Sequence, residues 1–596
     1  MGMEENQMKK FRKILAVILC FAIIGSASAA GMTAYAEKSE KTAEELIAEG
    51  ERKTKFMHWL LNDAVLGTIA KLIPNMKFVG KDSPEFDTEN FYKGNEWMNP
   101  GTDNFTWKLG YASESIIPDD FGVGFKYARG SYAPWGYSKD FYTDDDGNKE
   151  TMKVRTILLD DGTGRGLIAV CSIDCIGISN SDVKKIRAGI ADFAKEKNIV
   201  SVNISAIHSH MAIDSQGVWG APLSTAFNNF LSLTGLVKPK SGVNEDYLNT
   251  LIERTAASVK KAYADLKPGK LSYTDIKLHD FFGTRTVSPE LDSDMHKLAF
   301  IPDDGSAGTL LASFGAHPES TSYGAEFDSR LSSDFVYYME KLVNASGSNF
   351  IFVQGNVGTN SCWRGQSEDG LSFNDNHEIV IRYGYELAYI LLGAEMDTEK
   401  RIELNDRLGD KLGVKQYAGN ENYTVWYEGL PTFEAKPLEA VMNIQHKQVK
   451  LEIDNSTALV LLKLGLATNS IAYNRSERKY YTTTEVGYLQ LGKAFKAFFS
   501  PGELYSELYV GGYGLRLSSY KSLRESYGED VILFDLMNDA AGYVCPDETY
   551  AILGYKYNPS NNSLETDSWC LAVSIGSKAA STLMKAYADL MNQIPR

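Results

Sequence analysis

The chain has few cysteines, and their spacing does not pair them. One of the six lies near the N-terminus, and the others are Cys171, Cys175, Cys362, Cys545 and Cys570. The five cysteines beyond the N-terminal one are odd in number and contain no Cys-x-x-Cys pair. They therefore indicate neither a disulfide framework nor a cysteine-rich zinc knuckle. Cys171 and Cys175 share one apolar run, where four strand residues span about 13 Å, too far for a disulfide. We therefore expect buried free thiols.

Basic charge is also scarce. The net charge is −16, and the N-terminal leader described next carries a basic excess, so the remainder is more acidic still. Such acidity disfavours phosphate backbones and anionic membranes as bulk partners, although it leaves room for a local basic patch. We expect no nucleic-acid partner.

Long hydrophobic runs are absent from the N-terminus. The apolar stretch at residues 14–24 has 11 residues, and at about 1.5 Å per residue it is too short to cross a bilayer core of about 30 Å. Four basic residues precede it, and the small-residue motifs Ala-Ser-Ala and Ala-Tyr-Ala follow it. Residues 1–36 are therefore predicted to be an export signal, and the protein secreted, extracytoplasmic or associated with the cell surface.

The remaining chain alternates between apolar strand patterns and amphipathic helix patterns, without repeats or low-complexity linkers. This alternation predicts an α/β fold, a layered sandwich of mixed β-sheets flanked by helices. We expect a helical, turn-rich extension over residues 37–105 and a single large catalytic domain over residues 106–596. The spacing predicts one long helix in residues 41–73, packed on the main domain or lying on a membrane.

Histidines stand where two predicted strands end. His208 and His210 follow "VNISAI", and His317 follows "LASFGA". Sites in open α/β folds assemble at the carboxyl ends of strands, and positions two apart on a strand share a face. The His-x-His pair alone fits a metal site, a general base beside a metal, or two unrelated side chains. A third histidine at another strand end strengthens the case for a metal site to an even balance with ordinary packing, so the alternatives stay open.

Five motifs resemble the neutral, non-lysosomal ceramidases and their bacterial relatives. They are "ISAIHSHMAIDSQGVWG", "FGAHPESTSYGAEFDSRLSSDF", "FVQGNVGTNS", "SPGELYSEL" and "NDAAGYVCPDETY", and they occur in the family's order. The resemblance covers roughly residues 108–590. It implies a secreted zinc amidohydrolase that cleaves the N-acyl amide of ceramide or a related lipid, with Zn²⁺ as cofactor.

The resemblance also implies a ligand set. The first histidine of the His-x-His motif is His208, the histidine before proline is His317, and the family's Pro-Gly-Glu and tyrosine motifs fall on Glu503 and Tyr543. Without the resemblance, we would expect Glu503 to be a turn carboxylate and Tyr543 to be one of many packing tyrosines.

Three further residues are implied as catalytic. His210 is placed to donate a hydrogen bond to an oxyanion, and Ser361 matches a family serine regarded as a nucleophile or a substrate-binding group. Arg285 in "GTRTVSP" resembles a segment that contacts substrate oxygen. Plain alternatives are a loop hydroxyl for Ser361 and a structural ion pair for Arg285.

Two departures put ceramide itself in doubt. The family continues His-x-His with Ser-Gly-Pro-Gly, whereas this chain reads "MAID", and no C-terminal immunoglobulin-like domain is expected. Alternatives are therefore a hydrolase of another N-acyl amide or ester, or a noncatalytic cell-surface binding protein on the same fold. A (β/α)₈-barrel metallohydrolase would leave the other four motifs unexplained. The apolar stretch "APLSTAFNNFLSLTGLVKPK" is predicted to form a lid or lipid-entry surface, or a core helix, which allows transient membrane contact.

Overall fold

The computed structural model describes most of the chain after the leader. The described residues are 41–76, 78–81, 89–101, 105–124, 126–130, 137–220, 222–278, 283–284, 291–319, 329–361, 376–412, 430–511, 520–551, 554–558, 562–566 and 573–595. The predicted export signal lies outside them and stays a prediction.

The larger of two mixed sheets has nine strands among the described residues, in the order β12-β11-β10-β8-β2-β5-β6-β7 with β14 beside β8. Its strands are β2 (Trp107–Ser115), β5 (Lys153–Asp160), β6 (Leu167–Ile173), β7 (Ile199–Ala206), β8 (Lys267–Lys277), β10 (Asp294–Pro302), β11 (Thr309–Phe314), β12 (Asn349–Gln354) and β14 (Lys436–Pro437). The pairs β6–β7 and β11–β12 are parallel, and the apolar runs that form them are buried almost throughout.

The smaller sheet is built from the last third of the chain. It contains β1 (Gly80–Lys81), β15 (Met442–Glu452), β16 (Ala472–Asn474), β17 (Lys479–Leu491), β18 (Phe495–Phe499) and β20 (Val531–Phe534). Short two-stranded pieces stand apart: β3 (Tyr127–Ala128) with β4 (Tyr137–Ser138), β9 (Gly283–Thr284) with β13 (Asn360–Ser361), β19 (Glu503–Leu504) with β21 (Tyr543–Val544), and β22 (Tyr555–Asn558) with β23 (Ser563–Thr566).

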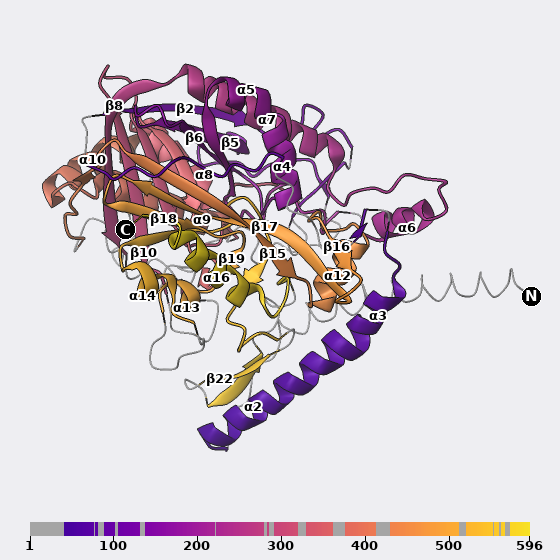
Figure 1. Ribbon diagram of the computed structural model, residues 1–596. Coiled ribbons are helices and arrows are strands. Elements are labelled where there is room, and N and C mark those ends of the chain that lie inside the picture. The colour runs from indigo at the N-terminus through magenta and orange to yellow at the C-terminus, as the bar shows by residue number, and fades with distance from the viewer. Residues whose placement is uncertain are drawn as a thin grey trace, which may run out of the picture.

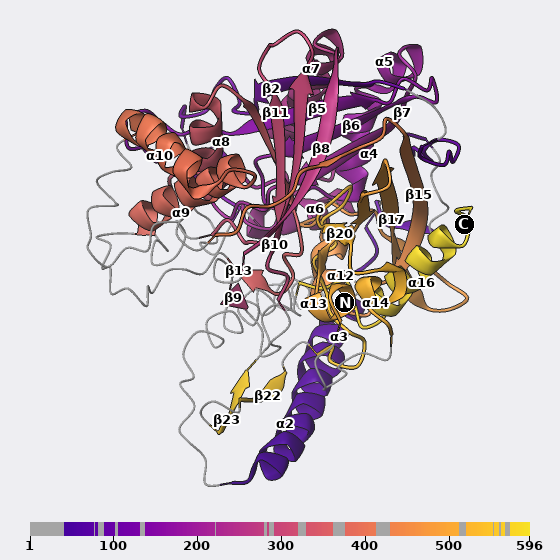
Figure 2. The same cartoon turned by 90° about the vertical axis from the view of Figure 1, so that its left-hand side faces the viewer.

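The two sheets face each other and helices cover their outer faces (Figures 1 and 2). Packed on the larger sheet are α4 (Asn180–Ala188), α5 (Ala191–Glu196), α7 (Glu245–Ala264) and α8 (Phe335–Ala345), with α9 (Asn376–Gly393) and α10 (Thr398–Leu412) beyond α8. Packed with the smaller sheet are α12 (Ser456–Lys463), α13 (Ser506–Tyr509), α14 (Leu523–Tyr527) and α16 (Ala579–Met591). This order of layers confirms the predicted α/β sandwich of mixed sheets.

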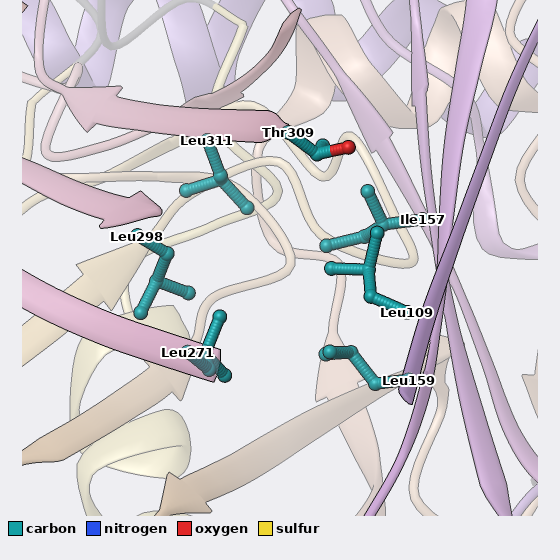
Figure 3. A pocket seen from close by; sticks show the side chains of 7 residues that line it. All are labelled: Leu109, Ile157, Leu159, Leu271, Leu298, Thr309 and Leu311. Carbon is teal, nitrogen blue, oxygen red and sulfur yellow. The ribbon is translucent and has the colours of Figure 1, made fainter. Parts of the chain in front are cut away.

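Aliphatic and aromatic side chains fill the layer between the sheets. Figure 3 shows six aliphatic side chains, among them Leu109, Leu271 and Leu311, together with Thr309 around a cavity of about 10 Å³. A space of this size and apolarity is at the lower limit for one water molecule. It is a packing gap within the core, so a ligand site has to be sought elsewhere.

The predicted N-terminal helix is present but its hydrogen bonding changes midway. It comprises α2 (Ala43–His58), the π-helical turn η1 (Trp59–Leu66) and α3 (Gly67–Leu72). The Gly67 N–H bonds to the Asn62 carbonyl, and a Cβ on Gly67 would lie 2.8 Å from that oxygen. Leu66 and Ile69 are buried against α12, which confirms packing on the main body. No described helix is long and apolar enough to span a bilayer.

The helical stretch after β6 is interrupted. It is divided into α4 and α5 around Gly189, where a Cβ would lie 2.8 Å from the Ile252 side chain. Cys171 lies in β6, whereas Cys175 lies beyond the strand; both are buried and free, as is Cys545. The domain boundary near residue 105 stays a prediction.

Candidate metal centre

His208 lies in a turn rather than in the strand that leads to it. Strand β7 ends at Ala206, and His208 has φ 70°, in the left-handed region that non-glycine residues seldom adopt. The N–H groups of His208 and Ser209 both donate to the carbonyl of Cys175, at 3.0 and 3.1 Å. Strand alternation was therefore the wrong reason to expect His208 and His210 on one side. The turn brings them together, with their Nε2 atoms 3.3 Å apart.

His317 reaches the same point from β11, which lies near the opposite edge of the larger sheet from β7. It follows β11, is buried, and its ring centroid lies 4.8 Å from that of His208. The three histidines bring one ring nitrogen each to within 4.8 Å of one another. The strand-end rule thus predicted their convergence correctly.

Backbone carbonyls fix the orientation of two imidazoles. Nδ1 of His208 lies 2.6 Å from the Ile176 carbonyl, and Nδ1 of His317 lies 2.7 Å from the Asn360 carbonyl. A carbonyl oxygen only accepts, so each Nδ1 carries a proton. Each Nε2 can then present its lone pair toward the cluster, which is the arrangement found in metal-ligating histidines. No feature of the sequence around Ile176 indicated its part.

Glu503 and Tyr543 enter together from a short parallel ladder. Strands β19 and β21 pair Glu503 directly with Tyr543. The Glu503 Oε2 lies 3.5 Å from His208 Nε2 and 3.4 Å from His317 Nε2, while the Tyr543 hydroxyl lies 3.3 Å from His317 Nε2. All four residues that the motifs singled out as ligands therefore meet in one buried cluster.

The spacing of these atoms fits a tetrahedral ion. With metal–ligand bonds of about 2.05 Å, two ligands of a tetrahedral zinc lie about 3.3 Å apart. Three separations within this set, from Glu503 Oε2 to the two imidazoles and from the Tyr543 hydroxyl to His317, run from 3.3 to 3.5 Å. Glu503 Oε2 is buried and has no hydrogen-bond partner among the described residues. A buried carboxylate oxygen facing imidazole lone pairs needs a cation, so the residues fit a zinc ion.

Electrostatics keep the glutamate in the charge state of a ligand. Burial raises the pKa of Glu503, but the attraction of His208 and then His317 outweighs burial and holds that pKa well below its usual value. Burial lowers the pKa of His208, yet the Glu503 carboxylate outweighs this and raises it. Glu503 is consequently an anion, with positive charge favoured beside it.

A buried aspartate fixes the strand that carries Glu503. Asp535, just after β20, accepts the N–H groups of Leu504 and Val357 at 3.2 and 2.9 Å. The Asn356 side-chain amide donates to the Leu504 carbonyl at 2.6 Å. A Cβ on Gly358 would lie 2.4 Å from that same oxygen, so glycine permits the close approach. The loop "GNVGTNS" therefore supports Glu503, a part that sequence reasoning did not assign to it. Asp535 lies outside every motif considered.

The other predicted catalytic residues are placed less fully. Ser361 lies in β13, paired with Gly283, and directly follows Asn360, whose carbonyl orients His317. Arg285 lies outside the described residues. His210 is buried and its Nε2 is as near to His208 Nε2 as a second ligand would be, so the geometry suits a ligand as well as the predicted donor.

Two other groups of metal-binding residue types already contain basic side chains. Asp144, Asp145 and Asp146 surround the Lys341 ammonium at 2.6 to 3.0 Å. In the group of Asp275, Asp294 and His296, Asp294 contacts both Lys277 and Arg524. Positive charge is already supplied at both places, which leaves the histidine cluster as the best candidate.

Comparison with known proteins identifies the fold. No family model and no curated protein sequence matches the chain. Among solved structures, the neutral ceramidase from Pseudomonas aeruginosa aligns with a TM-score of 0.54 and 14% identity, covering 83% of this chain and 76% of the other. A ceramidase complexed with C2 aligns with a TM-score of 0.53 and 13% identity over the same shares. The chain therefore has the fold of the neutral ceramidases.

Proposed function

We propose that this protein is a zinc-dependent hydrolase that cleaves the N-acyl amide bond of ceramide or a related N-acyl lipid. The observation that carries the proposal is the meeting of His208, His317, Glu503 and Tyr543, from four distant segments, in one buried cluster on this fold. A buried carboxylate oxygen that lies against imidazole nitrogens without a hydrogen bond would destabilise a purely structural core, so this arrangement supports a metal site.

His208, His317, Glu503 and Tyr543 would hold the ion. Zinc in such a site lowers the pKa of water toward about 7 and polarises a carbonyl oxygen. The reaction adds the oxygen of water to the acyl carbon and breaks the C–N bond, giving a fatty acid and an amine that leaves with a proton.

The surrounding residues have separate tasks. The carbonyls of Ile176 and Asn360 keep His208 and His317 turned toward the ion, and Asp535 keeps the Glu503 strand in place. His210 would donate a hydrogen bond to the oxyanion that forms at the acyl carbon. Ser361 and Arg285 remain proposed contacts of the substrate oxygens.

A second candidate keeps the chemistry and changes the substrate to another N-acyl amide or an ester. The segment after the His-x-His motif favours it. Met211, Ala212 and Ile213 are fully buried, and the Asp214 carboxylate accepts the N–H groups of Gln216, Gly217 and Trp219. This buried segment differs in sequence from the family's Ser-Gly-Pro-Gly and directly follows His210 in the chain. A noncatalytic binding protein would leave the assembled ligand set without a use.

Metal analysis together with a substrate panel tests the proposal. The purified protein should contain about one zinc per chain and hydrolyse at least one member of a panel of short- and long-chain ceramides, N-acyl amino acids and simple esters. Turnover of the N-acyl amino acids or esters alone would select the second candidate. Zinc far below one per chain after purification without chelator would rule out both hydrolases. We also propose export, which N-terminal sequencing of the extracytoplasmic protein would test.

A further inference from the structure

Exposed apolar side chains gather on one segment of the molecule. The part of the chain that the structure describes exposes fifteen large hydrophobic residues, and six of them fall within residues 223–237: Leu223, Phe227, Leu231, Leu233, Leu236 and Val237. Scattered exposed leucines are ordinary, whereas a contiguous group marks an interaction surface. We refer to residues 222–240 as the α6 segment, after its helix α6 (Pro222–Ser232).

Helix α6 has an apolar face, and this face is exposed to solvent, whereas a core helix buries its apolar face. Leu223, Phe227 and Leu231 recur every four residues and are 46%, 54% and 37% exposed. The opposite face buries Ala226, Asn229 and Ser232. Ala226 packs on the apolar cluster shared by α3 and α12, so the orientation of the helix is fixed. Figure 1 shows α6 at the periphery of the molecule, away from both sheets.

Asn229 holds the chain that follows α6 against the helix. Its side-chain amide donates to the carbonyls of Lys240 and Leu464, and its side-chain oxygen accepts the Lys240 N–H at 2.7 Å. Asn228 holds the Lys238 carbonyl in the same way, at 2.9 Å. These hydrogen bonds therefore hold the exposed apolar residues and the two exposed lysines together in the α6 segment.

The charge of the segment is opposite to that of the whole chain. Residues 222–244 contain Lys238 and Lys240 and no acidic residue, in a chain of net charge −16. An apolar helix face flanked by lysines is the pattern of an element that lies in a membrane interface and contacts anionic headgroups.

The α6 segment also borders a cleft. This cleft of about 350 Å³ opens between the segment and the start of α7, lined by Thr225 and Lys240 from the segment and by Ile213 and Asp214 from the chain after His210.

We propose that the α6 segment docks the protein on lipid bilayers that contain anionic phospholipids, with Leu223, Phe227 and Leu231 in the interface and Lys238 and Lys240 against the headgroups. The proposal concerns binding only and holds whether or not the cluster hydrolyses an amide. It predicts that the two lysines outweigh the repulsion between the acidic chain and an anionic surface at physiological ionic strength, because a Debye length of about 8 Å screens distant acidic residues more than lysines in contact with headgroups.

Vesicle flotation of the full-length chain tests the docking. The vesicles are phosphatidylcholine alone, or phosphatidylcholine and phosphatidylglycerol in equal parts. Leu223→Ser/Phe227→Ser should weaken binding to both kinds on the order of tenfold, because each change removes apolar contact with the interface. Lys238→Gln/Lys240→Gln should lose on the order of tenfold only with the anionic vesicles.

Phe56→Ser is the matched control, because Phe56 on α2 is 56% exposed and Phe227 is 54% exposed. It should bind like the wild type. All variants share the same N-terminus, so any effect of residues 1–36 is common to them. Equal binding of the wild type and the α6 variants would overturn the proposal, as would a loss with Phe56→Ser equal to that with Leu223→Ser/Phe227→Ser. A wild-type dimer that both α6 variants convert to monomer would assign the surface to a second copy of the chain and overturn it too.

Discussion

Glu503 and Tyr543 are direct neighbours across the parallel pair β19–β21, although 39 residues separate them in the chain. This pairing aims a carboxylate and a phenol at the same imidazole, that of His317. Adjacent positions on neighbouring parallel strands point to the same face. A two-residue ladder thus delivers half of the proposed ligand set as a unit, and whatever moves β19 moves both ligands.

Gly358→Ala should disturb that unit. The added Cβ would lie 2.4 Å from the Leu504 carbonyl and 2.7 Å from the Glu503 carbonyl, so β19 must shift. We expect a loss of about 1–3 kcal/mol in unfolding free energy, together with weaker zinc retention. Thermal unfolding and metal analysis measure the two effects. Gly220→Ala is the control, since its Cβ would meet only ordinary contacts from 3.6 Å. Unchanged zinc affinity in Gly358→Ala would argue against support of Glu503 by this loop.

His210→Gln separates the two tasks that its position allows. As a donor to the oxyanion, His210 should be dispensable for zinc, and its loss should lower kcat by about 10² to 10³ with about one zinc still bound. Metal content and kcat are measured on the same preparation. If zinc is lost along with activity, His210 is a ligand and the assignment as a donor falls.

Ser361→Ala addresses the serine of the "GNVGTNS" loop. We expect zinc to stay bound, because the neighbouring Asn360 carbonyl that orients His317 belongs to the backbone and is unchanged. Turnover should fall, because the Ser361 hydroxyl is the proposed contact of a substrate oxygen. Turnover and zinc content are compared with the wild type. Full turnover in the variant would remove the Ser361 hydroxyl from the mechanism.

Asp539 should make stability depend on pH. Burial raises its pKa to about 7, with hydrogen bonds from the N–H groups of Asn180 and Ala540 opposing the rise. The unfolded pKa of an aspartate is about 3.9, so the folded state binds the extra proton and is favoured at low pH. That stabilisation is complete below about pH 4 and is lost as the pH rises from there through about 7, on the order of 4 kcal/mol in all.

Asp539→Asn should flatten this part of the profile. Asparagine keeps an oxygen to accept the two N–H groups and has no proton to lose. Unfolding by urea at pH 5 and at pH 8 measures the difference. A wild-type stability that falls no more than that of Asp539→Asn between these two values would show that Asp539 is already ionised in the folded protein.

The positions of His208 and His317 at strand ends predicted that these two residues meet. Glu503 and Tyr543 joined the set only through the resemblance of the motifs to the ceramidases, because no local pattern marks either residue. The layered α/β class followed from the alternation of strand and helix patterns. The left-handed turn at His208 did not follow, since strand periodicity gives no sign of where β7 ends. Asp535 was missed for a related reason. Its two N–H donors come from Leu504 and Val357, and no spacing in the sequence links the three.

The α6 segment illustrates a further limit. Its apolar residues fit a buried helix as well as a lipid-contacting one, and sequence periodicity cannot tell which face is covered. Burial of Ala226 and Asn229, with Phe227 exposed, excludes a helix that is buried all round and leaves its apolar face open to a partner.

The most direct test of the whole account is the zinc content of Glu503→Gln beside that of the wild type. Glutamine keeps the size of the side chain and removes the negative charge that faces His208 and His317. We predict about one zinc per chain in the wild type and a loss of zinc affinity of about 100-fold or more in the variant, with folding retained by circular dichroism. Equal zinc content and affinity in the two proteins would contradict the assignment of the metal centre.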